Sequence, residues 1–203
     1  AVSRVEASVF NESGRVRVAV VDYGAKTSIM RRLRRAGAAV TVFPHLASPD
    51  ELAGFDGVLL SNGPGDPEPL AAEVEAIRGL LGRTSVLGIC LGAQVLARGL
   101  GAQNLLGAAP EFGWCEVALT DGAGDDPLLA GLPDRFPIFQ WHSDSFTVAQ
   151  SVVLVLVEQC WISRLLLTMR RHSIRLLLLL IRRRWLSSGL KRCCREIGWA
   201  QSC

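Results

Sequence analysis

The feature that most constrains the fold is a regular alternation of short, β-branched apolar runs with segments of helical periodicity. The strand-like runs are residues 15–21, 38–43, 57–61 and 85–89. After the first run, Ile29, Met30, Leu33 and Ala36 recur at the spacing of one helix face, and Gly37 ends that helix. Strands and helices that alternate at this pitch predict an α/β fold, in which an open, mostly parallel, doubly wound sheet carries helices on both faces.

Local signals place the other elements. Ser48, Pro49 and Glu51 predict the start of a helix, because a serine cap, a proline in the first turn and a glutamate three residues after the cap form a capping box. The remaining elements expected are a helix over 91–100, closed by a glycine, strands over 115–119 and 136–140, and a turn over 128–132.

The composition changes sharply near residue 150. Residues 1–150 carry 12 Lys and Arg against 17 Asp and Glu, whereas residues 151–203 carry 10 against 2. All 9 prolines and 18 of the 20 glycines precede the change. The chain therefore divides into an N-terminal extension (1–14), one α/β domain (15–150) and a basic tail rich in leucine and arginine (151–203).

Cys90 is the candidate nucleophile. It stands between Gly88 and Gly92 in VLGICLGAQ, where a strand-like run meets a helix-like one. This pattern is typical of a nucleophile elbow, a tight turn that projects the side chain above the edge of the sheet. The helix N-terminus favours thiolate over thiol, and the Leu91 amide would point toward an oxyanion. The alternative is an ordinary buried thiol of the core.

The loop SNGPGDP, which begins at the end of the run 57–61, is a second candidate. Its glycines let backbone amides approach a substrate closely, so Gly63 or Gly65 is a candidate oxyanion donor. Ligands bind at the carboxyl ends of parallel strands, and we therefore expect the backbone of Gly63–Gly65 to lie close to Cys90. The alternative is a plain turn, since Gly-Pro-Gly alone breaks regular structure.

Together these motifs carry a resemblance. DGVLLSNGPGDP followed by GICLGAQ resembles the class I (triad-type) glutamine amidotransferases, whose fold is flavodoxin-like. The stretch RVRVAVVDYGAKTSIMRRLRRAGAAVTVFP is similar to the start of the glutaminase domain in the carbamoyl-phosphate synthetase small subunit. The later stretch from PEFGWCEVALT to HSDSF is more similar to stand-alone and GMP-synthetase-type members. The resemblance ends near residue 150, which implies a truncated amidotransferase domain.

The resemblance implies an activity, the hydrolysis of glutamine to glutamate and ammonia for a partner synthetase, most similar to the carbamoyl-phosphate type. Cys90 would attack the side-chain amide of glutamine and form a glutamyl thioester that water hydrolyses. Gly63 or Gly65, with the amide of Leu91, would line the oxyanion and substrate pocket. The other glutamine-binding positions that it implies are Gln94, Trp141, His142, Ser143 and Asp144. For His142 it implies a role in shaping this site and not that of the base.

The base and its orienting acid are not found. In the family they come from a late His-Pro-Glu turn, yet none of His45, His142 and His172 is followed by Pro-Glu. The late acids, Glu158 and Glu196, do not stand two residues after any histidine. The competing hypothesis is therefore a catalytically inactive remnant or a glutamine-binding module.

The tail explains this gap. We interpret residues 151–203 as a non-native extension, produced by a change of coding frame near residue 150, that replaces the second half of the triad. The alternatives are a basic amphipathic segment over 164–185, a metal site at Cys193 and Cys194, and a divergent but native tail.

The expected ligands are glutamine and a synthetase subunit or domain that accepts ammonia, with no nucleic acid or membrane partner. No cofactor or metal is expected on the glutaminase domain, because ATP would bind only to the synthetase. Ala1–Asn11 lacks the apolar core of a signal peptide, and no wholly apolar run is longer than Leu176–Ile181. With only Cys90 and Cys115 in the domain, a reducing, cytoplasmic location is expected.

Overall fold

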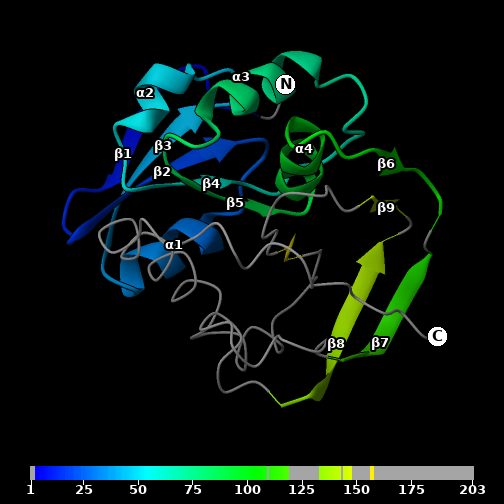
Figure 1. Ribbon diagram of the computed structural model, residues 1–203. Coiled ribbons are helices and arrows are strands. Elements are labelled where there is room, and N and C mark those ends of the chain that lie inside the picture. Colours follow the sequence, from blue (N-terminus) through cyan, green and yellow to red (C-terminus); the bar gives the residue numbers. More distant parts are fainter. Residues whose placement is uncertain (1–2, 109, 119–132, 143, 148–155, 158–203) are drawn as a thin grey trace.

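The computed structural model describes residues 3–108, 110–118, 133–142, 144–147 and 156–157. In this part of the chain the main sheet has the strand order β1-β3-β2-β4-β5-β10 (Figure 1). These strands are β1 (Ser8–Asn11), β2 (Val16–Asp22), β3 (Ala38–Pro44), β4 (Gly57–Leu60), β5 (Ser85–Ile89) and β10 (Leu156–Val157). Every neighbouring pair is parallel except β1 with β3. The expected α/β class with an open, mostly parallel sheet is confirmed.

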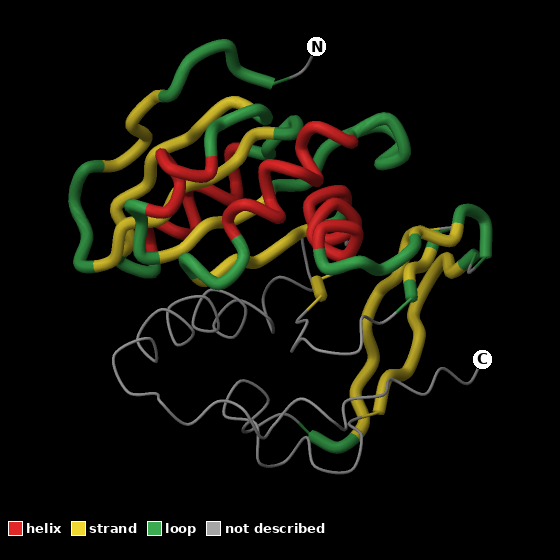
Figure 2. Tube along the Cα trace, turned by 45° about the horizontal axis from the view of Figure 1, so that its top comes forward, coloured by secondary structure: helices red, strands yellow, loops and turns green. Residues whose placement is uncertain are grey.

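Helices cover both faces of this sheet, as Figures 1 and 2 show. The helices are α1 (Thr27–Arg35), α2 (Pro49–Ala53), α3 (Ala71–Leu80) and α4 (Leu91–Gly99). α1 packs on one face through Met30 and Leu33. The other three helices pack on the opposite face, where Leu52, Ile77 and Leu96 belong to one buried cluster.

The continuous apolar run of β2 follows from this arrangement. Val18 and Val20 pack in the cluster beneath α1, while Ala19 and Val21 pack in the cluster beneath the other helices. Successive side chains of a strand point to opposite faces, so a strand buried on both faces needs an apolar residue at every position. All four of these residues are at most 1% exposed.

The capping box that starts α2 is present. Glu51 N donates to Ser48 Oγ at 3.3 Å, and Ser48 N donates to the Glu51 carboxylate at 3.0 Å. The hydroxyl and amide of Ser48 both favour the charged form of the carboxylate, which lowers the pKa of Glu51. The local sequence therefore fixes this helix start without help from the rest of the fold.

Two smaller antiparallel sheets lie beside the main one. β6 (Asn104–Leu105) pairs with β9 (Ser145–Phe146), and β7 (Glu111–Ala118) pairs with β8 (Arg135–His142). Both views show the β7–β8 pair projecting from the body of the molecule (Figures 1 and 2). The strands expected over 115–119 and 136–140 thus exist and start earlier than predicted, while the turn expected over 128–132 lies outside the described residues.

Segments on both sides of the expected domain 15–150 contribute to the main sheet. β1, in the segment expected to be an extension, forms one edge, and Ser3 Oγ accepts from His45 N at 3.1 Å. β10, in the segment expected to be a tail, forms the other edge and pairs with Gly88 and Ile89. The rest of that tail lies outside the described residues. No helix within the described ranges has the length and apolarity needed to cross a membrane.

Tyr23 follows β2 and is the chain's single tyrosine. It is 5% exposed, and its hydroxyl has no hydrogen-bond partner among the described residues. Burial, and secondarily the negative charge of Glu73, raises the pKa of Tyr23 above its ordinary value. The unfolded chain therefore loses this proton at a lower pH than the folded protein does, and stability falls as the pH rises above about 10.

We expect Tyr23→Phe to weaken this alkaline loss of stability. At neutral pH the substitution should raise the free energy of unfolding by about 1 kcal/mol, because an unpaired buried hydroxyl is costly. Urea unfolding of both proteins across alkaline pH measures the difference. Absorbance of tyrosinate reports Tyr23 alone in the wild type, and a native titration at the ordinary tyrosine pKa would contradict the expectation.

Candidate functional site

Cys90 occupies the turn between β5 and α4. It is the N-cap residue of α4, with φ 55° and ψ −118°. Among the described residues it is the only non-glycine residue with a positive φ. Such a backbone costs about 1–3 kcal/mol and typically persists at functional sites. The turn therefore has the strained geometry of a nucleophile elbow, with Cys90 9% exposed.

Close packing explains the glycines on either side of Cys90. A Cβ atom on Gly88 would lie 2.5 Å from the Cα atom of Ala93, and one on Gly92 would overlap the carbonyl of Leu60. The Gly92 amide donates to the Ser61 carbonyl at 3.1 Å. The first turn of α4 thus packs directly against the end of β4, which only glycine permits.

The start of α4 favours a negative charge at Cys90. Its first turn contains no acidic residue. The amides of Ala93 and Gln94 donate to the Cys90 carbonyl at 2.8 and 3.1 Å, so the helix begins at this residue. The positive end of the helix dipole therefore lies at the elbow, where it stabilises a thiolate.

The glycine loop after β4 lies against the same turn. Tyr23 N donates to the buried Ser61 Oγ at 3.0 Å, and Lys26 N donates to Asn62 Oδ1 at 3.2 Å. A Cβ atom on Gly63 would overlap the Tyr23 carbonyl and lie 2.9 Å from Leu91 Cδ2. Gly63 is therefore packed between the end of β2 and the residue that follows Cys90, as expected from the sheet order. Gly65 follows in the loop with φ 107°.

The other predicted positions that the structure describes lie on α4, on β8 and in the loop between β8 and β9. Gln94 is half-buried on α4, one turn after Cys90. Trp141 and His142 end β8, where their backbones pair with Phe112 and Glu111. Ser143 lies outside the described residues. The half-buried Asp144 accepts from Gly107 N at 2.9 Å, which connects it to the segment between β6 and β7.

A pair formed by the half-buried His45 and the buried Glu73 lies at the same end of the sheet and was not predicted. His45 Nδ1 and Glu73 Oε1 are 2.7 Å apart, and Glu73 is 5% exposed. The residues are 28 positions apart in the sequence, and no local motif signals their contact. His45 follows β3, and Cys90 follows β5. In the sheet, β2 and β4 lie between these two strands. Three strand spacings amount to about 14 Å, which separates the end of β3, before His45, from the end of β5, before Cys90.

The remaining candidates for a base, His172, Glu158 and Glu196, lie outside the described residues. Among the described residues, no group of three His, Cys, Asp or Glu side chains is arranged to hold a metal ion.

Residues 19–162 match the family model for Glutamine amidotransferase class-I. The chain belongs to the class-I glutamine amidotransferases. The match extends past the limit expected near residue 150 and includes β10. The strand beside β5 is therefore part of the region that resembles the family.

Two curated relatives show which members this amidotransferase chain is similar to. The carbamoyl phosphate synthase small chain of Listeria monocytogenes is 48% identical over 90 residues, which are 43% of this chain and 25% of that protein. The carbamoyl phosphate synthase small chain of Rhodopirellula baltica is 48% identical over 101 residues, which are 49% of this chain and 26% of that protein. The chain spans about a quarter of the length of these relatives.

Solved structures share the fold. A GMP synthase subunit from Thermoplasma acidophilum has a TM-score of 0.66 at 20% identity and covers 84% of this chain and 96% of its own. A glutamine amidotransferase from Thermotoga maritima has a TM-score of 0.53 at 27% identity, covering 68% and 65% of the two chains.

We expect Gly92→Ala to destabilise the protein by about 1–3 kcal/mol or more, because the added methyl group would overlap the Leu60 carbonyl. Gly54→Ala is the matched control. Gly54 has φ −72°, and its Cβ would meet nothing closer than the Glu51 carbonyl at 3.7 Å. This control should be neutral or stabilising by about 0.4–1 kcal/mol. Urea unfolding compares the two variants, and equal stability would rule out the close packing of α4 on β4.

Proposed function

We propose that this chain is the glutamine-hydrolysing part of a carbamoyl-phosphate-type synthetase, releasing ammonia from glutamine for a partner subunit. The observation that supports this most is the strained Cys90 at the N-terminus of α4, with the Gly63 loop packed against the next residue. The similarity to small chains of carbamoyl phosphate synthase supports the choice of partner.

The proposed chemistry uses the thiolate of Cys90. It attacks the side-chain amide carbon of glutamine and forms a carbon–sulfur bond, while the carbonyl oxygen becomes an oxyanion. The amide nitrogen takes a proton and leaves as ammonia when the carbon–nitrogen bond breaks. Water then cleaves the glutamyl thioester and releases glutamate. The amides of Leu91 and of Gly63 or Gly65 would donate to the oxyanion, each contributing about 10²–10³ in rate.

The substrate would lie along the start of α4. Gln94 is one turn beyond Cys90 and therefore on the same helix face, where its amide would contact glutamine. We assign the α-amino and α-carboxylate groups of glutamine to the segment Trp141–Asp144, following the family resemblance. In this assignment His142 shapes the pocket and is not the base.

The proton-transfer groups stay unassigned, and this favours a second candidate function. His45 contacts Glu73, and it follows β3, which lies three strand spacings from β5 in the sheet. No histidine of the chain precedes Pro-Glu. A chain that keeps the elbow but lacks the base and acid would act as a glutamine-binding module without turnover.

The proposed partner is the synthetase subunit that accepts ammonia and binds ATP. The similarity to the named small chains, which covers about a quarter of their length, is what supports this partner. We propose the reducing cytoplasm as the location, because the chemistry proposed for Cys90 requires a reduced thiol.

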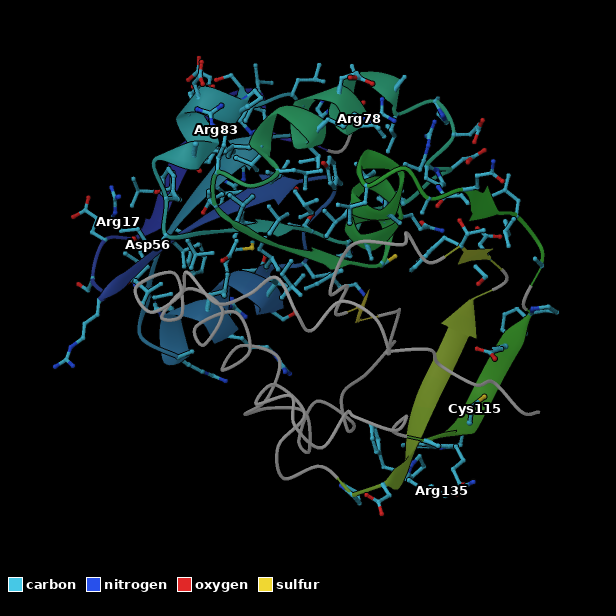
Figure 3. All side chains as sticks on the ribbon, in the orientation of Figure 1. Arg17, Asp56, Arg78, Arg83, Cys115 and Arg135 are labelled. Carbon is cyan, nitrogen blue, oxygen red and sulfur yellow. The ribbon has the colours of Figure 1, made fainter. Side chains whose placement is uncertain are left out.

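A glutamine-mimicking electrophile, such as a chloro-oxo analogue of norleucine from which the thiolate displaces chloride, should label Cys90 and spare Cys115. Cys115 is the internal control because it lies on the projecting β7 (Figure 3) and is more exposed than Cys90. Accessibility alone would therefore favour Cys115. Peptide mass spectrometry with and without excess glutamine measures the selectivity. Equal labelling of both thiols, or no protection by glutamine, would refute the proposed pocket.

The second candidate function predicts that ammonia release from glutamine is slow or undetectable for this chain, even with a synthetase partner present. Loss of one member of a nucleophile–base–orienter unit costs several orders of magnitude, because the members act together. The comparison is between the wild type and Cys90→Ala. A robust turnover that disappears in Cys90→Ala would show that a base is present, and it would overturn this expectation.

A further inference from the structure

We propose that Arg98 is a positioning residue of the glutamine pocket, which holds the Gly63–Gly65 loop along α4 so that its amides face Cys90. The inference rests on the proposed function, because it concerns the same pocket. It adds a residue that lies outside both the GICLGAQ and the SNGPGDP motifs.

The contacts of Arg98 join the last turn of α4 to the end of the glycine loop. Its Nη1 donates to the Pro67 carbonyl and, at 3.1 Å, to the Glu68 carbonyl. Two backbone acceptors for one guanidinium nitrogen give a charge-assisted clamp, and such bonds are stronger than neutral ones. Arg98 is half-buried, so water competes less for these carbonyls than it would at an exposed site.

The loop contacts α4 at two places, through Gly63 and through the carbonyls of Pro67 and Glu68. Its beginning is fixed at the elbow, where Gly63 packs on Leu91. Its end is fixed by Arg98, which is eight residues after Cys90 and therefore about 12 Å along the helix axis. Cys90 and Arg98 belong to one rigid element, so the clamp sets the position of the loop relative to the nucleophile.

Two further hydrogen bonds shape the end of the loop. Glu68 N donates to Asp66 Oδ1 at 2.8 Å, and Leu70 N donates to the Pro67 carbonyl at 3.2 Å. Both bonds lie within the loop segment and shape it without connecting it to α4. Beside the clamp is a cavity of about 200 Å³ lined by Arg98, Arg78 and Glu75, among others.

The test compares Arg98→Met, which keeps the aliphatic chain without donors, with Arg98→Lys, which keeps one charged donor group. Arg83→Met is the matched control, since Arg83 forms an ion pair with Asp50 on α2, away from the glycine loop (Figure 3). For each variant of the chain, the rate of Cys90 modification is measured with the chloro-oxo analogue of norleucine and with iodoacetamide, which lacks the amino-acid groups.

We expect Arg98→Met to slow modification by the glutamine mimic about 10-fold or more, since a small misplacement of pocket groups is costly. Iodoacetamide should modify Cys90 at the wild-type rate, Arg98→Lys should recover part of the loss, and Arg83→Met should behave as the wild type. Hydrogen exchange of the peptide 62–70 should quicken in Arg98→Met alone. Unchanged reaction with the mimic, or an equal loss with both reagents, would overturn the inference.

The proposed function can fail separately in this design. For each cysteine of the wild type, the rate of modification by the mimic is divided by the rate of modification by iodoacetamide. The proposed function fails if this ratio is no higher for Cys90 than for Cys115. Hydrogen exchange then decides the structural part of the inference by itself: faster exchange in Arg98→Met supports the clamp, and unchanged exchange overturns it.

Discussion

The close approach of α4 to the end of β4 is the constraint on which the candidate site depends. It exists because Gly92 has no side chain to overlap the Leu60 carbonyl, and the Gly92 amide bonds to Ser61 across the same contact. To reach that position directly from β5, the chain must turn at Cys90 with a positive φ. Strain at the cysteine is therefore a consequence of helix packing, and the buried contacts on both sides of the turn offset its cost.

Parallel pairing brings the elbow and the glycine loop together. β4 and β5 are neighbours in register, from Gly57 with Ser85 to Leu60 with Gly88, so they end at the same level. The loop that leaves β4 and the helix that leaves β5 must then start side by side. The same pairing places β2 next to β4, so that Tyr23 supplies the wall against which Gly63 packs. A shift of register by one residue would move all three elements apart.

The sequence predicts those parts of the structure that local signals determine. The runs that become β2 to β5, the capping box of α2 and the elbow glycines can all be read from neighbouring residues. Contacts between residues that are distant in the sequence cannot be predicted in this way. β1 is a short edge strand with a mixed sequence, and β10 is two residues in a long run of valine and leucine, so their strand character comes from pairing partners. His45 with Glu73 and Arg98 with Pro67 are likewise brought together only by the fold.

Activation of a cysteine nucleophile and completion of a turnover are separate steps that need different groups. Formation of the thiolate requires an electrostatic environment, and the N-terminus of α4 supplies one through fixed dipoles. Departure of ammonia requires a proton on the amide nitrogen, and no dipole can donate a proton. An electrophile that reacts at Cys90 without such a transfer reports on the elbow and the loop alone. Glutamine hydrolysis reports in addition on an acid and base, and these must come from residues other than those that build the elbow.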